Sequence, residues 1–128
     1  MSIQTEASAV AAHTLAVRYI AAWNETDAAR RAELVAAAFT PDVRYQDQMM
    51  EGEGHAGIGA LIAGVQQRFA GHRFALHGTP DAHHGVLRFS WALGLPDAAP
   101  VARGTDVAEL DGAGRLRQVT GFLDYLAG

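Results

Sequence analysis

Apolar residues recur at helical spacing in the first part of the chain. Over residues 8–23, an alanine-rich segment, Leu15, Tyr19 and Trp23 follow one another at four-residue intervals. Residues four apart lie on the same face of an α-helix, so this pattern predicts an amphipathic helix. A second stretch with an apolar stripe, AARRAELVAAAF, spans residues 28–39 and predicts a second helix.

Cap signals and a third periodic segment complete the helical half. Thr26 or Asp27 can cap the second helix through a side-chain oxygen, and the sequence TPD that follows ends it. The segment IGALIAGVQQRF, residues 58–69, has apolar residues at helical spacing, although its glycines weaken a helix. We therefore predict three helices before residue 70.

The rest of the chain shows the alternation that is typical of strands. Residues 43–47, VRYQD, predict a short strand before the third helix. Beyond residue 71, turn-rich sequences separate four longer strand segments: HRFALHG, VLRFSWALGL, VARGTDVAEL and RLRQVTGFLDYL. This order predicts an α+β domain in which three N-terminal helices pack in a strongly curved antiparallel sheet. Such a sheet can form a cone with an internal cavity.

Composition narrows the class of protein. The 128 residues fit one domain, and 49% hydrophobic with 19% charged residues is typical of a globular protein. A net charge of -4 without a basic stripe argues against nucleic acid as a partner. No basic n-region with an apolar core begins the chain, and no run is long enough to cross a membrane. The absence of cysteine is compatible with the cytoplasm, where we expect this protein.

Two aspartates lie on apolar strand faces, where a carboxyl group is energetically unfavourable. Asp106 shares its face with small or apolar residues, among them Gly104 and Ala108. Because an isolated buried charge is very costly, this carboxyl must be paired, protonated or at a cavity. Asp47 shares its face with Val43 and Tyr45, so we expect it to face a pocket; the simpler alternative is an aspartate that caps the following loop.

The six histidines do not form a metal motif. His83 and His84 lie in a turn with their rings on opposite sides, and the others lack ligand spacing. His77 shares a strand face with Arg73 and Ala75 and is the histidine with a chance of reaching the cavity. No glycine-rich dinucleotide loop of GxGxxG spacing and no GxSxG elbow occurs, so we expect neither metal nor cofactor.

The chain resembles the nuclear transport factor 2-like superfamily, whose members include ketosteroid isomerases and polyketide cyclases. The resemblance extends over nearly the whole chain and is carried by RYIAAWNETD, FTPDVRYQD, the glycine-rich stretch before the third helix, and GTDVAELDGAGRLRQVTGF. It implies the cone-shaped fold. These pieces specify fold better than function, since the same fold hosts many activities.

The isomerase branch implies roles for three residues. By resemblance, Asp47 is the general base, while Tyr19 and a protonated Asp106 donate hydrogen bonds to the oxyanion; the chemistry is a known one for that branch. The chain departs from the branch where Gln48 follows Asp47 in place of proline. The resemblance also implies a homodimer formed through the outer face of the sheet.

The expected ligand is a small apolar molecule held in the cavity. We expect the pocket to be lined by Trp23, Tyr45, Val65, Phe69, Phe89, Trp91, Leu93, Gly104, Ala108, Val119, Gly121 and Leu123. Glycines at 104 and 121 are expected to widen it.

Three functions remain open from the sequence. The first is proton transfer on an apolar carbonyl compound in an isomerase or cyclase-like reaction. The second is a ligand-binding or dimerisation module without catalysis. The third is epoxide hydrolysis through an Asp-Arg-Asp arrangement, for which Arg88 and Arg103 are the strand candidates, although both are expected to face away from Asp106.

Overall fold

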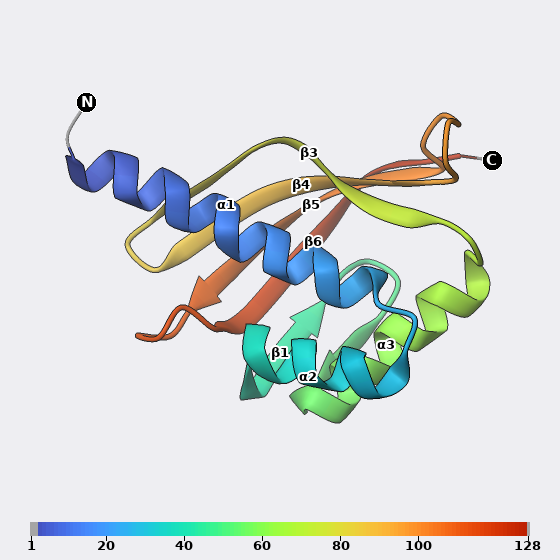
Figure 1. The fold of residues 1–128 in the computed structure, drawn as a ribbon, viewed down its shortest axis with the longest axis horizontal. Helices are drawn as coiled ribbons and strands as arrows, with labels where there is room; N and C mark the ends of the chain where they lie inside the picture. Colours follow the sequence, from blue (N-terminus) through green and yellow to red (C-terminus); the bar gives the residue numbers. More distant parts are fainter. Residues whose placement is uncertain (1–2, 128) are drawn as a thin grey trace.

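Three helices pack against one curved sheet of six strands (Figure 1). The computed structural model describes residues 3–127. In chain order the elements are α1 (Ile3–Asn24), α2 (Ala28–Ala38), β1 (Phe39–Gln46), β2 (Glu51–Glu53), α3 (Gly54–Arg68), β3 (Arg73–His83), β4 (Val86–Gly94), β5 (Ala102–Leu110) and β6 (Leu116–Leu126). Helix α1 contacts β3, and α3 contacts β1 and α2. The predicted α+β class and the three helices are confirmed.

The sheet is mixed rather than purely antiparallel, which corrects the prediction. Its strand order is β2-β1-β6-β5-β4-β3, and β1 pairs with β6 in parallel while all other pairs are antiparallel. Two strands from opposite ends of the chain therefore lie side by side. Strand β1 begins at Phe39, four residues earlier than predicted, and the irregular register between Phe39 and Arg44 accommodates Pro41.

Two other strand boundaries differ from the sequence prediction. Strand β3 continues through the TPDAH sequence that we expected to be a turn, with a register shift between His77 and Asp81. The reversal is confined to His84 and Gly85, which have φ values of 47° and 77°. Strand β2 was missed, because three residues of a glycine-rich segment carry no periodicity.

Polar side chains fix the end of α1 to the sheet and to its neighbours. The Asn24 side chain donates from Nδ2 to the carbonyl oxygen of Phe74 at 2.9 Å and accepts from the Phe74 amide at 2.8 Å. Asp27 caps α2 by accepting from the Arg30 amide at 2.8 Å, so the predicted cap is confirmed. These contacts set the orientation of the helix that carries Tyr19.

The core lies between the helices and the concave face of the sheet. Phe39, Val43, Ile58, Ile62 and Leu87 are among its fully buried residues. Among residues 3–127, no helix combines the length and apolar character that a membrane-spanning segment needs.

Candidate functional site

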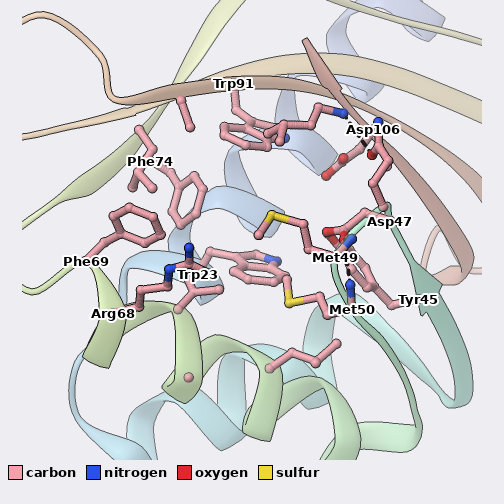
Figure 2. Close-up of a pocket in the computed structure, with 18 of the residues that line it drawn as sticks. Trp23, Tyr45, Asp47, Met49, Met50, Arg68, Phe69, Phe74, Trp91 and Asp106 are labelled. Carbon is pink, nitrogen blue, oxygen red and sulfur yellow. Dashed lines mark hydrogen bonds between the residues drawn. The ribbon is translucent and has the colours of Figure 1, made fainter. Parts of the chain in front are cut away.

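A pocket with a volume of about 360 Å³ lies between the helices and the sheet (Figure 2). Most of its lining is apolar or aromatic, which is the usual character of a small-molecule site. Buried residues of the lining are Tyr19, Ile20, Trp23, Tyr45, Leu93, Ala102, Asp106 and Gly121. Exposed residues, which mark where the pocket meets solvent, are Gln48, Met49, Ala60, Gly64, Arg68, Phe122 and Leu126.

Asp106 and Tyr19 form a buried hydrogen-bonded pair. The Tyr19 hydroxyl donates to Oδ2 of Asp106 at 2.7 Å, and the two residues are 3% and 2% exposed. Tyr19 comes from the apolar stripe of α1, and Asp106 comes from the inward face of β5, where Gly104 and Ala108 are buried beside it. The predicted burial of this carboxyl group is confirmed.

Burial makes the Asp106 carboxyl a stronger proton acceptor than an ordinary aspartate. Loss of hydration raises its pKa from 3.8 to about 6, against the lowering effect of the Tyr19 hydroxyl and the Trp91 indole, and the charge of Asp47 adds to the rise. The pKa of Tyr19 is itself raised, by burial first and then by the Asp106 charge, so its hydroxyl remains protonated. Among the described residues, no cationic side chain forms an ion pair with Asp106.

Asp47 lies just after the end of β1 and accepts three hydrogen bonds. Its Oδ2 accepts from the Tyr45 hydroxyl at 2.6 Å, and its Oδ1 accepts from the amides of Met49 at 2.7 Å and Met50 at 2.9 Å. Burial raises the pKa of Tyr45 beyond its ordinary range, so this phenol is also a proton donor. Asp47 therefore lines the pocket and caps the following loop at the same time.

Gly121 on β6 allows the two carboxyl groups to approach each other. A Cβ atom at this position would lie 2.8 Å from Oδ1 of Asp106 and 3.2 Å from Cβ of Asp47. Neither neighbour could avoid such an atom without moving. The absence of a side chain at Gly121 therefore leaves room for both carboxyl groups beside it.

The structure brings most of the expected site residues together. Tyr19, Asp47 and Asp106 all line the pocket, together with Trp23, Tyr45, Val65, Phe69, Trp91, Leu93, Gly121 and Leu123.

Four expected residues do not line the pocket. Phe89, Ala108 and Val119 are buried in the core beyond its closed end. Gly104 does not widen the pocket, because the Trp91 indole occupies the space above it: a Cβ there would lie 2.3 Å from the ring. Strand alternation gives the correct face for these residues but does not say how deep along the strand the pocket extends.

Sequence reasoning missed several lining residues. Arg68 ends α3 at the pocket, and Met49 and Met50 enter from the loop after β1 (Figure 2). Phe74 lies on the inward face of β3, where its alternation with exposed Arg73 was a usable signal.

The histidines lie apart from the site. His77 is exposed on β3 and does not line the pocket. His55 contacts the carbonyl oxygen of Phe39 through Nε2 at 2.8 Å. Within residues 11–127, no three His, Asp or Glu side chains are grouped so that they could hold a metal ion.

Comparisons with known proteins identify a family and a fold for this chain. The SnoaL-like domain family matches residues 16–119. A solved structure of a proposed isomerase of the SnoaL-like family from Agrobacterium tumefaciens is 50% identical, with a TM-score of 0.86, over 90% of this chain and 98% of that chain. No curated protein matches the chain.

Two more distant structures share the fold. One is a protein of unknown function with a cystatin-like fold from Methylobium petroleophilum, 21% identical with a TM-score of 0.72 over 94% of this chain and 80% of that one. The other is a proposed polyketide cyclase from Sinorhizobium meliloti, 15% identical with a TM-score of 0.65 over 84% and 93%. The predicted α+β fold, three helices packed against a strongly curved sheet, is confirmed, and the sheet is open and mixed.

Proposed function

Because the chain belongs to the SnoaL-like domain family within the nuclear transport factor 2-like superfamily, we propose that it is a cofactor-independent proton-transfer enzyme. Its substrate would be a small apolar carbonyl compound, and the reaction an isomerisation or a cyclisation. The observation that carries the proposal is a buried aspartate, Asp106, facing an apolar pocket with a tyrosine hydroxyl on its carboxyl group.

The geometry favours Asp106 as the general base, in place of Asp47. A pKa of about 6 leaves Asp106 ionised at neutral pH but gives it a higher proton affinity than a solvated aspartate. Asp47 already accepts three hydrogen bonds, so only one of the about four lone-pair sites on its carboxylate is left for a proton. We assign Asp47 the positioning of the Tyr45 hydroxyl and of the loop with Met49 and Met50.

The proposed step balances without a co-reactant. Asp106 takes the proton from the carbon next to the substrate carbonyl, and the electron pair of the broken C–H bond moves into the enolate. Once Asp106 is protonated, the Tyr19 hydroxyl no longer faces an anion and can donate to the enolate oxygen. The same proton then returns to another carbon in an isomerisation. In a cyclisation the enolate carbon attacks a second carbonyl, and the alkoxide oxygen that forms there takes the proton from Asp106.

A binding module without catalysis is the second candidate. The observation in its favour is the pair of amide hydrogen bonds from Met49 and Met50 to Asp47, which is what a purely structural loop cap would make. In this case the pocket would bind the same apolar ligands but leave them unchanged.

Epoxide hydrolysis has less support. Arg88 pairs with Asp81 at 3.4 Å on the exposed face of the sheet. Arg103 lies 5.1 Å from the ring centre of Tyr125 and is exposed as well. Neither arginine lines the pocket. The arginine that does, Arg68, is exposed and, among the described residues, forms no ion pair with Asp47 or Asp106.

Exchange of carbon-bound protons provides a test that does not require the natural substrate. 2-Tetralone, a small enolisable ketone, is incubated with the protein in D2O and its α-protons are followed by NMR, alongside a panel of enone isomerisation assays. We expect Asp106→Asn to lower the enzyme-dependent rate by about 10²-fold or more, as for loss of a general base. Asp42→Asn, at an exposed position of β1, is the matched control and should keep the wild-type rate.

Two outcomes would contradict the proposal, one for the identity of the base and one for catalysis itself. If Asp47→Asn abolishes exchange while Asp106→Asn retains it, the base is Asp47 and our assignment is wrong. If the wild-type protein binds 2-tetralone but catalyses neither exchange nor isomerisation of any compound, the binding module is the correct reading.

A further inference from the structure

The indole nitrogen of Trp23 is a buried donor without an acceptor. Trp23 is 4% exposed, and its Nε1 has no hydrogen-bond partner. Among the described side chains, Thr40 Oγ1 is the other such atom, and Thr40 does not line the pocket. A buried donor that loses water without gaining an acceptor carries a desolvation cost.

The other buried side-chain donors of the pocket lining are already used, whereas Gln48 and Arg68 lie exposed at its mouth. The Tyr19 hydroxyl donates to Asp106 and the Tyr45 hydroxyl donates to Asp47. The centre of the Trp23 ring is 6.0 Å from that of Tyr19 and 5.7 Å from that of Tyr45. A ligand acceptor bound at Trp23 would share one pocket with the two carboxyl groups, since Trp23, Asp47 and Asp106 all line it.

Flexible side chains cover this donor. Figure 2 shows Met49 and Met50 reaching from the loop after β1 toward the Trp23 indole. A methionine is unbranched and adapts its shape easily, while its sulfur is only a weak acceptor. Met49 is 56% exposed, so its side chain can turn outward when a ligand enters.

We propose that Trp23 Nε1 is the hydrogen-bond donor that holds the carbonyl oxygen of the ligand. The ligand class is then an apolar molecule with at least one oxygen acceptor placed at its buried end, and hydrocarbons of equal size bind less well. Trp23 would orient the substrate carbonyl so that its α-carbon faces Asp106. The inference rests on the proposed function for the kind of ligand, but it concerns binding and holds whether or not a reaction follows.

The test compares 2-tetralone with tetralin, the hydrocarbon of the same ring system. The chain has two tryptophans, so the 15N-labelled protein gives two indole N–H signals, which Trp91→Phe assigns. We expect 2-tetralone to move the Trp23 indole N–H signal downfield. Tetralin, which has no acceptor, should not cause this downfield shift. In a binding titration, Trp23→Phe should lower the affinity for 2-tetralone by about two- to tenfold more than the affinity for tetralin, which is the effect of losing one neutral hydrogen bond.

Two results would overturn the inference: an equal loss of affinity for both compounds in Trp23→Phe, or a Trp23 signal that shows no downfield shift with saturating ketone. Circular dichroism of Trp23→Phe checks that the variant is folded. Failure of the proposed enzyme function looks different, because the Trp23 signal then responds to 2-tetralone while no proton exchange is seen.

Discussion

The buried carboxyl of Asp106 makes the stability of the protein depend on pH in the mildly acidic range. Its carboxyl is raised in pKa from 3.8 to about 6, mainly by burial. The folded state therefore holds a proton that the unfolded state has lost between these two values. The favourable contribution is complete below about pH 4 and is lost as the pH rises through 6.

Removing the charge should remove this pH dependence. We expect Asp106→Asn to become more stable relative to the wild type as the pH rises from 4 to 7, by at most about 3 kcal/mol from the size of the shift. Urea unfolding of both proteins at pH 4, 5.5 and 7 measures this difference in the free energy of unfolding. A difference between the two proteins that stays constant over this range would contradict the raised pKa.

Gly121 gives a second prediction at the residue scale. In Gly121→Ala the added methyl would lie 2.8 Å from Oδ1 of Asp106, so the carboxyl must move. We expect the exchange rate of 2-tetralone to fall by about 10²-fold, since small displacements of a reacting group are costly, and stability to fall by about 1–3 kcal/mol. Gly112→Ala, which meets no atom within 4 Å, is the control and should change neither.

The sequence predicted part of the site residue by residue. Asp106 was singled out because a carboxyl group on an apolar strand face is visible in the pattern, whereas Tyr19 was named through the family resemblance. Arg68 was missed, because the side of α3 that meets the pocket depends on how the helix is oriented. Gly104 was misassigned, since alternation cannot show that a neighbouring ring fills the space above a glycine.

Among the elements, α3 is weakened by its own composition. Gly59 lies inside this helix, has an ordinary φ value, and a Cβ there would meet nothing within 4 Å. We expect Gly59→Ala to raise the free energy of unfolding by about 0.5–1 kcal/mol, because alanine loses less backbone entropy on folding. Gly54→Ala, at φ 73°, should destabilise instead, and a stabilised Gly54→Ala would contradict this reasoning.

Pairing partners were harder to predict than the strands themselves. Alternation along residues 43–47 identified a strand and its inward side, and Val43 and Tyr45 are indeed buried. It carried no information that β1 pairs in parallel with β6, about seventy residues further on. Such a partner is set by how the helices and the sheet pack together, which depends on the whole chain.

At the scale of the whole molecule, the expected homodimer stays a prediction. Strand β6 exposes Phe122 by 52%, Tyr125 by 42% and Leu126 by 46%, an apolar group that a second copy could cover. If it does, Phe122→Glu should shift the protein toward the monomer in sedimentation velocity. Arg117→Glu, an exposed site earlier on the same strand, is the control. A wild-type protein that is monomeric at high concentration would exclude the dimer.

The parallel contact between β1 and β6 has a consequence for how the chain could be divided. The connection from α3 to β3, residues 69–72, separates a first fragment with Asp47 from a second with Asp106. Each fragment would carry one acid and part of the hydrophobic lining, so two purified fragments would restore the pocket only by docking β1 on β6 and α1 on β3. The two acids would then share a site only in the reassembled protein.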